Sequence, residues 1–418
     1  MKPKSPAILT LKTDVEHHPR WFPSRPSALF PGITMRIVNA LYCSISLLSI
    51  CLPSFSYGAD PSEEFFNDLV MPILDISLSD ASIDQLKRNP REYVQATLSD
   101  GLTTWQQVAI KLKGAAGSFR QLHQKPGFTL NMDKYTDGQR FQGMDKFYLN
   151  NSVQDPSYLN ELICSDLYLR AGIPAPRVTL ALVRLNDRVL GIYVLKEGFD
   201  KAFLKRHFAK HKGNLYDPGN ARDIDNPLER DSGEGRSDGS DVIALVNAVN
   251  EIDGRRRWQQ IQSTLDVDRF ITFVALEVIT WHWDGYAMNR SNYRIYHDPS
   301  KGRIVFMPHG MDQMFWNPEG SISPQFKGLV AQKVLELPQA KQRYRERLES
   351  LLTSVFTPER TTNRINAANA NLAPLLALLG DQATAEHRKH AEIVGNRILK
   401  RYEFLRNEVS GRAVASPR

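Results

Sequence analysis

Three polar residues near position 300 have the types and the order that phosphoryl-transfer chemistry requires. Asp284 stands five residues before Asn289, and a second acid, Asp312, follows after two short β-type runs at 292–297 and 303–308. Moving a phosphoryl group asks for one carboxylate near the acceptor hydroxyl and for oxygen ligands that hold Mg²⁺ on the phosphates. Asp284 could supply the carboxylate, and Asn289 and Asp312 could supply the metal ligands.

The same spacing also has an ordinary structural explanation. Protein kinases place a catalytic Asp and a metal-binding Asn in D-x-x-x-x-N order, and a later Asp binds the main metal. A chain of 418 residues contains several such spacings by chance, and Asn and Asp are common turn residues. The motifs His-Arg-Asp and Asp-Phe-Gly are both absent. Taken alone, this stretch therefore favours a helix end followed by a hairpin.

Two other regions could bind phosphate. The small-residue turn at 113–118 could donate backbone N–H groups to phosphate oxygens, with Lys113 and Ser118 at its ends. Lys125 stands at the start of a strand expected at 128–132, where a phosphate-pairing cation would lie. A β-turn explains the first region equally well, and a solvated surface Lys is the commoner role for the second.

The first 58 residues have the features of an export signal. Residues 1–34 are rich in Pro without apolar periodicity, which indicates a non-structural extension or a start of translation at Met35. Residues 35–58 join a basic start, an apolar run and a small-residue end, as in a secretory signal peptide cleaved after Gly58. A single membrane anchor is the alternative, but the apolar run is at the short limit for a span. The sequence therefore predicts a secreted, periplasmic or cell-envelope protein.

Removal of this signal peptide and of the extension before it lowers the net charge of the chain. The net charge falls from +7 to 7 − 4 = +3, because residues 1–58 contain six Lys or Arg and two acidic residues. Such mild basicity, with no stripe of Lys and Arg between aromatic residues, gives no indication of nucleic-acid binding. Cys164 is the one cysteine that remains, so no internal disulfide is possible. Stability must come from a core, for which about 360 residues give ample material.

The exported part is expected to combine strands and helices in an α+β fold. The polar, turn-rich stretch 214–241 is predicted to be a mobile loop that closes over a substrate. Alternating β-rich runs predict strands at 71–78, 93–98, 105–112, 128–132, 177–185, 188–195, 292–297 and 303–308. Helical patterns predict helices at 80–88, with Asp80 as cap, 155–171, 200–208, 241–252 and 266–281, and several more between 330 and 410.

A longer series of motifs gives the sequence a specific resemblance. Three runs occur in this order: FYLNNSVQDPSYLNELICSDLYLRAGIPAPRVTLALVRLNDRVLGIYVLKEGFD, GNLYD and NYRIYHDPSKGRIVFMPHGMD. Together they resemble the CotH kinase family, named for spore coat protein H, over most of residues 105–405. The resemblance implies an atypical, two-lobed protein-kinase-like fold with a helical C-terminal region. It also implies transfer of phosphate from ATP, with Mg²⁺ or Mn²⁺, to hydroxyl groups of a protein substrate at the cell surface.

The resemblance also assigns roles to individual residues. Asp284 matches the catalytic acid, Asp312 the metal-binding acid, and Lys125 the lysine that pairs with phosphate. Asn289, on its spacing, and Asn292, which precedes the Tyr strand, are two candidates for the second metal ligand.

Two further acids receive roles from the resemblance. Glu161 lies in the segment that forms the helix whose glutamate orients the lysine, and Glu197 stands where the family places a hinge contact to adenine. The family usually has Val-Glu at this second place, whereas this chain has Lys196 before Glu197. Many members carry Trp-Asp-Met/Leu-Asp where this chain has HGMD at 309–312, which leaves one acid instead of two.

Three functions stay open at this point. The first is a secreted ATP-dependent protein kinase, the second a non-catalytic surface binding or assembly module, and the third a glycosidase with Asp284 and Asp312 as its carboxylate pair. The chain is expected to be a monomer without a membrane span after signal cleavage. The expected parts are a lead with the first strands, a kinase-like domain that contains the mobile loop, and a disordered tail, at 59–104, 105–410 and 411–418.

Overall fold

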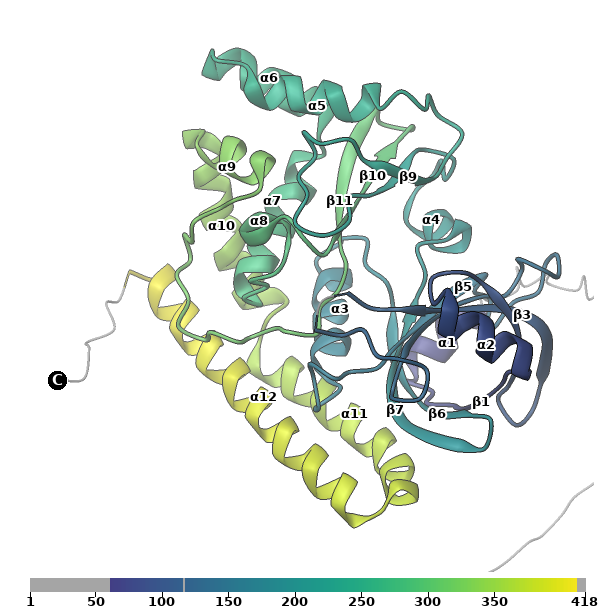
Figure 1. The fold of residues 1–418 in the computed structure, drawn as a ribbon. Helices are drawn as coiled ribbons and strands as arrows, with labels where there is room; N and C mark the ends of the chain where they lie inside the picture. The colour runs from purple at the N-terminus through teal and green to yellow at the C-terminus, as the bar shows by residue number, and fades with distance from the viewer. Residues whose placement is uncertain (1–60, 116, 412–418) are drawn as a thin grey trace, which may run out of the picture. The chain divides into compact units, whose positions relative to one another are not determined.

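Seven strands close into a barrel in the computed structural model, which describes residues 61–115 and 117–411 (Figure 1). The strand order is β1-β2-β3-β4-β5-β7-β6, and the parallel pairing of β1 with β6 closes the ring. The other neighbouring pairs are antiparallel. The strands are β1 Ile73–Ser77, β2 Val94–Ser99, β3 Thr104–Lys113, β4 Gly127–Asn131, β5 Lys146–Asn150, β6 Val178–Leu185 and β7 Arg188–Glu197.

Alternating side chains of these strands fill the barrel. Successive residues of a strand point to opposite faces, so positions two apart share the interior. On β3 and β4 the register places Ile110 opposite Leu130 and Leu112 opposite Phe128, and all four side chains are buried. Each such burial stabilises the fold by roughly 1.5–3 kcal/mol. The barrel therefore has its own apolar core, which fixes where β3 ends and where its last residue, Lys113, lies.

A second sheet of four strands follows in the order β11-β10-β8-β9. Its strands are β8 Leu215–Asp217, β9 Glu229–Ser232, β10 Tyr293–Asp298 and β11 Arg303–Pro308. Leu215 pairs with Tyr296 and Tyr216 with Ile295, and these side chains are buried. The prediction of one continuous loop at 214–241 is therefore wrong, because two short strands within it join the sheet.

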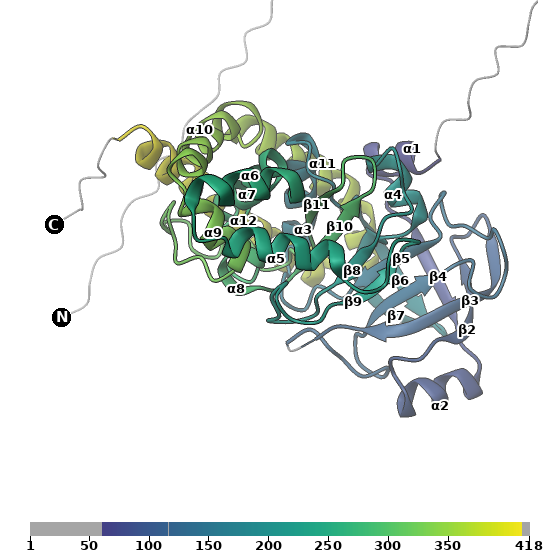
Figure 2. The same ribbon diagram turned by 90° about the horizontal axis from the view of Figure 1, so that it is seen from above.

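The helices pack around this sheet and against the barrel. The helices are α1 Pro61–Asn67, α2 Asp80–Arg88, α3 Asn160–Arg170, α4 Lys201–His207, α5 Ser240–Asn250, α6 Gly254–Thr264, α7 Val267–Ile279, α8 Tyr286–Asn289, α9 Leu329–Leu335, α10 Pro338–Ser354, α11 Pro358–Leu379 and α12 Asp381–Val409. Each residue from Phe270 to Ile279 on α7 is buried, so this helix forms the centre of the larger core. α11 and α12 run side by side as a long hairpin (Figures 1 and 2).

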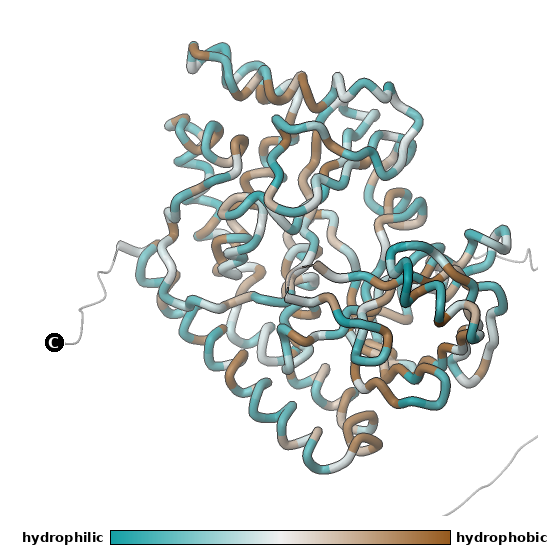
Figure 3. Tube along the Cα trace, in the orientation of Figure 1, coloured by the Kyte–Doolittle hydropathy of each residue, from teal (hydrophilic) through white to brown (hydrophobic). Residues whose placement is uncertain are grey.

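The long helix α12 presents one apolar face. Its buried residues Ala391, Val394, Ile398 and Leu405 recur at intervals of three, four and seven, which is the period of one helix face. Figure 3 shows the same pattern as hydrophilic and hydrophobic colours that alternate along the tube. In the part of the chain that the structure describes, no helix combines the length and the apolar character that a membrane span needs.

The expected α+β class is confirmed, and several elements lie where the sequence placed them. α2 and β11 have the predicted bounds, although Ser79 rather than Asp80 caps α2, by accepting a hydrogen bond from the backbone N–H of Ser82. Four further elements that are short or polar were not predicted, namely α1, β5, α6 and α8. The predicted extension at 1–34 and the signal peptide at 35–58 lie outside the described residues, as does all of the predicted tail except Gly411.

Candidate active site

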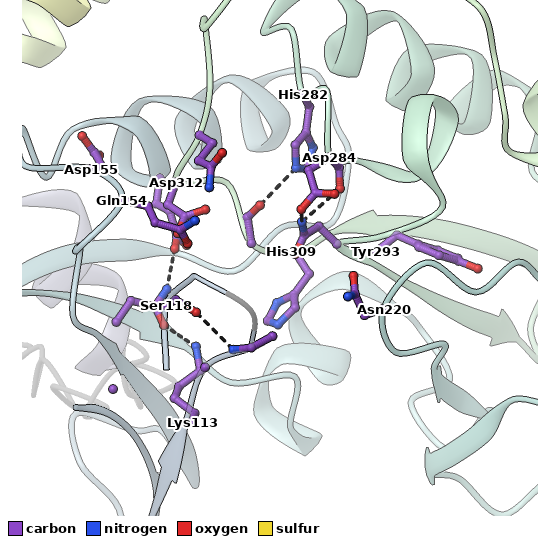
Figure 4. A pocket seen from close by; sticks show the side chains of 18 of the residues that line it. Lys113, Ser118, Gln154, Asp155, Asn220, His282, Asp284, Tyr293, His309 and Asp312 are labelled. Atoms are coloured by element: carbon purple, nitrogen blue, oxygen red, sulfur yellow. Dashed lines mark hydrogen bonds between the residues drawn. The ribbon is translucent and has the colours of Figure 1, made fainter. Parts of the chain in front are cut away.

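A pocket of about 540 Å³ lies where the end of β3, the start of α3 and the segments around β10 and β11 meet (Figure 4). Seven of the nine predicted site residues line it: Lys113, Ser118, Glu161, Asp284, Asn289, Asn292 and Asp312. They come from segments that are up to 199 residues apart, since 312 − 113 = 199. The fold thus brings most of the predicted chemistry to one place.

Two amide groups hold the carboxylate of Asp284. Asn289 Nδ2 donates to Asp284 Oδ1 at 2.6 Å, and Asn292 Nδ2 donates to Asp284 Oδ2 at 2.8 Å. Asn292 Nδ2 also lies 2.9 Å from the backbone carbonyl of Asp284. Both carboxylate oxygens are therefore oriented, and the amide oxygen of each Asn is the atom that could bind a metal. The sequence left open which Asn belongs to the site, and the structure places both Asn289 and Asn292 in the pocket.

Glu277 anchors the loop that carries Asp284. Its two carboxylate oxygens accept the backbone N–H groups of Tyr286 at 2.8 Å and Ala287 at 2.7 Å, at the start of α8. Burial raises the pKa of Glu277 to about 8, although these two backbone hydrogen bonds act to lower it. The sequence analysis missed Glu277. The feature of the sequence that could have indicated Glu277 is a single acidic residue near the end of the otherwise apolar run of α7.

His282 joins the Asp284 loop to the segment that carries Asp312. Burial lowers the pKa of His282 to about 4, against the hydrogen bond to Gly310, which acts to raise it. The neutral ring donates from Nε2 to the carbonyl oxygen of Gly310 at 3.0 Å, because a carbonyl can only accept. Gly310 has φ +35°, and a Cβ there would overlap the amide oxygen of Asn292. His282 was also missed, although it stands two residues before Asp284.

Asp312 lies at the inner side of the pocket. Burial raises the pKa of its carboxyl to about 6, and the nearby Glu161 raises it further, while its own backbone N–H and Lys196 oppose this shift. Asn160 Nδ2 donates to the backbone carbonyl of Asp312 at 2.8 Å, so the first residue of α3 fixes the segment. A cation beside this carboxylate would favour its ionised form.

A relay of four side chains forms the basic end of the pocket. Lys113 Nζ donates to Asn150 Oδ1, and Asn150 Nδ2 donates to Glu161 Oε1. Lys196 Nζ lies 2.8 Å from Glu161 Oε2, and both side chains are at most 2% exposed. Two lysines thus share one glutamate, so the relay retains an excess positive charge.

Burial and charge act in opposite directions on this relay. Burial lowers the pKa of Lys113 to about 8, although Glu161 acts to raise it. Burial alone would raise the pKa of Glu161, but Lys196, Lys113 and the hydrogen bond from Asn150 outweigh it and the pKa is lowered. A partly desolvated ammonium at the pocket wall is a group that gains from an anionic ligand. Lys113 is the one lysine among the described residues that line the pocket.

The structure does not bring Lys125 to the pocket. Its Nζ donates to the carbonyl oxygen of Ile192 at 2.8 Å and lies over the rings of Tyr158 and Tyr193, at 5.4 and 5.1 Å from their centroids. The assignment of the phosphate-pairing role to Lys125 is therefore corrected, because its ammonium is directed into a contact between the barrel and its surroundings. Lys113 takes its place as the candidate.

Glu197 also lies outside the pocket. Its carboxylate is fully buried and accepts from Arg177, at 2.9 Å, and from Arg206. Burial alone would raise its pKa, but these two guanidinium groups lower it. A side chain so engaged has no capacity left for adenine, so the predicted hinge contact through Glu197 is corrected as well. Ser118 keeps its place at the pocket, where its Oγ accepts the N–H of Ala115 and shapes the turn.

The donor atoms of the pocket fit one kind of metal. The described residues contain no group of three or more His, Cys, Asp or Glu that could hold a metal ion. The pocket instead offers the carboxylates of Asp284 and Asp312 and the amide oxygens of Asn289 and Asn292. Mg²⁺ prefers oxygen ligands and is often held by one or two carboxylates together with substrate phosphates. This set therefore fits a divalent cation that arrives with a phosphate ligand.

Comparison with protein families confirms the resemblance found in the sequence. The chain matches the family model described as CotH kinase protein over residues 110–414. The protein named Invasin CotH2 from Rhizopus delemar is 24% identical over 354 residues, which cover 74% of this chain and 58% of that relative. Inner spore coat protein H of Bacillus subtilis is 20% identical over 293 residues, which cover 65% and 80%. This chain thus spans less than two thirds of the fungal relative.

Solved structures give weaker similarities. A proinflammatory kinase of Helicobacter pylori is 10% identical, covers 66% of this chain and 94% of its own, and has a TM-score of 0.31. The Golgi casein kinase is 9% identical, covers 85% and 76%, and has a TM-score of 0.34. TM-scores of this size do not assign a fold.

Proposed function

This chain belongs to the CotH kinase family, and we propose that it is an atypical phosphotransferase that moves a phosphoryl group from a nucleoside triphosphate to a protein hydroxyl. One observation carries the proposal. A single pocket combines an oriented carboxylate, Asp284, with a second carboxylate, Asp312, and a half-buried ammonium, Lys113. Phosphoryl transfer depends chiefly on such positioning and charge.

The donor would lie between the basic and the acidic groups of the pocket. Lys113 would bind phosphate oxygens, helped by the turn that follows β3. Asp312 would hold Mg²⁺ or Mn²⁺ together with the amide oxygen of Asn289 or Asn292. When bound, the metal neutralises charge on the phosphates. The barrel with α3 would then form a nucleotide-binding lobe, as in a two-lobed kinase.

Asp284 would act on the acceptor. Its carboxylate would accept the proton of the attacking hydroxyl, and the hydrogen bonds from Asn289 and Asn292 would keep one geometry during that transfer. His282 and Glu277 would act as positioning residues, since they contact the backbone of the loops rather than the pocket's centre.

The acceptor is proposed to be a protein at the cell surface or in the envelope. Two related proteins are named a spore coat protein and an invasin, which is compatible with an exported location. Export would follow from the signal peptide predicted at 35–58, and the mature chain would act as a monomer. ATP is the donor that the family suggests.

Calorimetric titration of the purified protein with ATP, with and without Mg²⁺ or Mn²⁺, tests this proposal. We expect binding that requires the metal and is lost in Asp312→Asn, because the main metal carboxylate is gone. Asp284→Asn should keep metal-dependent binding but lower phosphoryl transfer at least about 100-fold, as expected for a general base.

A matched control is Asp84→Asn, which makes the same chemical change at an exposed acid of α2. It should bind ATP like the unchanged protein. Absence of ATP binding under any metal would refute the proposal and favour the non-catalytic surface binding module.

A further inference from the structure

Arg294 brings a second positive charge to the pocket. It lies on β10, lines the pocket with Lys113, and is 7% exposed. Within the described residues, its Nε atom has no hydrogen-bond partner. A buried donor without an acceptor costs about 1–3 kcal/mol, and more when it is charged. The Nε–H group of Arg294 is therefore suited to a ligand that supplies an acceptor oxygen.

Among the residues that the structure describes, Asp217 is the acid that pairs with Arg294, and it leaves part of the guanidinium without a partner. Asp217 Oδ2 forms an ion pair with Arg294 Nη1. The side chain of Asp217 is 42% exposed, and its Oδ1 accepts the backbone N–H of Gly219 at 3.0 Å. Water and the turn thus share the charge of this carboxylate, which weakens its hold on the buried guanidinium. Arg294 keeps much of its capacity for another anion.

Three neighbouring rings, those of Tyr148, His309 and Phe199, connect Lys113 to Arg294. Lys113 Nζ lies 5.0 Å from the ring centroid of Tyr148, and Arg294 Cζ lies 5.6 Å from that of Phe199. His309 stands between the two rings, at 6.1 and 5.6 Å from their centroids. The two cations therefore flank one continuous aromatic group.

Charge repulsion along this row agrees with the geometry. Burial lowers the pKa of His309 well below its ordinary value, and Lys196, Arg294 and Lys113 lower it further. His309 is consequently neutral, and its Nδ1 has no hydrogen-bond partner among the described residues. The neutral ring adds no charge to the two cations, which face a pocket whose acidic lining residues are Asp155, Glu161, Asp217, Asp284 and Asp312.

The lining of the pocket is rich in charged and polar side chains. Among its lining residues the large apolar or aromatic side chains are few, namely Val194, Trp283 and Tyr293. Most ligand pockets in proteins are predominantly apolar. The many charged groups and hydrogen-bonding side chains of the lining suit an oligoanion that carries a metal.

We propose that Arg294 forms a second anion subsite, which binds one phosphate of a polyphosphate chain while Lys113 binds another. The planar guanidinium presents paired donors that match phosphate oxygens, whereas Lys113 acts as a point charge. The proposal rests on the proposed function, because the chain in question is that of the phosphate donor. Arg294 would thus help to set the donor class, which is a compound with at least two linked phosphates.

Titration with inorganic tripolyphosphate and with ATP, each with Mg²⁺, tests this subsite in the purified protein. In Arg294→Gln we expect the affinity for both ligands to fall roughly tenfold or more, because a charge-assisted hydrogen bond is lost. Arg294→Lys should recover part of the loss, since it keeps the charge but not the planar donors. Thermal unfolding of each variant reports whether the fold is intact.

Asp217→Asn is the decisive companion variant. It breaks the same ion pair from the other side but leaves Arg294 in place, so affinity for tripolyphosphate should stay equal or increase. If Arg294 served only to pair with Asp217, both variants would weaken binding alike. If Arg294→Gln fails to fold, Asp217→Asn decides alone, because weaker tripolyphosphate binding in this variant would overturn the subsite.

Each remaining outcome has one meaning. Unchanged tripolyphosphate binding in a folded Arg294→Gln variant would overturn the subsite. Loss of ATP affinity alone would also overturn it, because Arg294 would then contact the base or ribose. If the unchanged protein binds tripolyphosphate through Arg294 but does not bind ATP, the subsite stands and the proposed nucleotide donor fails. Binding of neither ligand overturns both.

Discussion

Lys196 and Glu161 form an ion pair of 2.8 Å in which the two side chains are 0% and 2% exposed. The pair joins β7 of the barrel to α3, and so links the two elements beside the basic end of the pocket. Two charges removed from water are expensive, and their attraction must repay that cost. The pair therefore holds β7 and α3 together, and removal of either side chain would leave the other as an unpaired buried charge.

Replacement of Lys196 by Met should destabilise the protein strongly. The change leaves Glu161 buried with its charge opposed only through Asn150 and Lys113, and the loss of one partner from a buried pair typically costs about 3–5 kcal/mol. Urea unfolding measures this loss. The double variant Lys196→Met with Glu161→Gln should lose less than Lys196→Met alone, because no unpaired carboxylate remains.

The matched control for this pair lies on α2. Lys87 and Asp84 form an ion pair of 3.1 Å with side chains that are 62% and 57% exposed. Lys87→Met should change the free energy of unfolding by less than about 0.5 kcal/mol. Similar losses in Lys87→Met and Lys196→Met would contradict the special role of burial.

Glu277 should make stability depend on pH. Burial raises its pKa from 4.5 to about 8 in the folded protein, so the folded state binds a proton that the unfolded state has already released. The stabilising contribution is fully present below pH 4.5 and is lost as pH rises through about 8. Each unit of pKa shift corresponds to about 1.4 kcal/mol, so the loss should exceed that amount.

Unfolding free energies at pH 5 and pH 9 check the role of Glu277. Glu277→Gln should remove most of this pH dependence, because the amide cannot ionise. Glu349→Gln, at an exposed position of α10, should leave the dependence as it is. An unchanged slope in Glu277→Gln would show that another group causes it.

The sequence located the acidic half of the site better than the basic half. Asp284, Asn289 and Asn292 lie within nine residues, and local spacing keeps them together whatever the rest of the chain does. Glu161 and Lys196 meet only because the fold brings α3 against the β6–β7 hairpin, and nothing in the spacing of 196 − 161 = 35 residues indicates this contact. Lys125 looked suitable as a cation after a small-residue turn, but the barrel directs it to Ile192 instead.

The difference between local and long-range contacts also explains which elements of the fold were predicted from the sequence. α2 and β11 were predicted with their bounds because a cap, a periodic pattern and flanking turns are local signals. The closure of the barrel by β1 and β6 depends on a parallel pairing across more than 100 residues, which no local pattern reports. β8 is only three residues long and owes its conformation to pairing with β10. Tertiary contacts thus decide the elements that the sequence analysis missed.

Gly310 should tolerate no side chain. Its φ of +35° is unfavourable for other residues, and a Cβ would overlap the amide oxygen of Asn292. Gly310→Ala should therefore destabilise the protein by more than the roughly 1–2 kcal/mol that the backbone angle alone costs. Displacement of the segment to Asp312 should also weaken metal-dependent ATP binding, as calorimetry would show.

Gly302 serves as a control that separates the cost of the positive φ angle from the cost of the Cβ overlap. It has φ +64° in the turn between β10 and β11, and nothing lies within 4 Å of a Cβ built there. Gly302→Ala thus measures the cost of the backbone angle without a collision, and it should leave ATP binding intact. Equal stability losses in the two variants, with binding preserved in both, would refute the proposed contact between Gly310 and Asn292.

Lys113 and Lys125 offer the sharpest choice between sequence and structure. Lys113 lines the pocket, whereas the ammonium of Lys125 lies between the rings of Tyr158 and Tyr193. Lys113→Met should weaken ATP binding about tenfold or more, because a charged contact to phosphate is lost. Lys125→Met should leave binding within about twofold and lower the unfolding free energy by about 1 kcal/mol, since it removes cation–π contacts. The reverse order, with binding lost only in Lys125→Met, would restore Lys125 as the phosphate-pairing residue and would require the pocket to extend beyond its present lining.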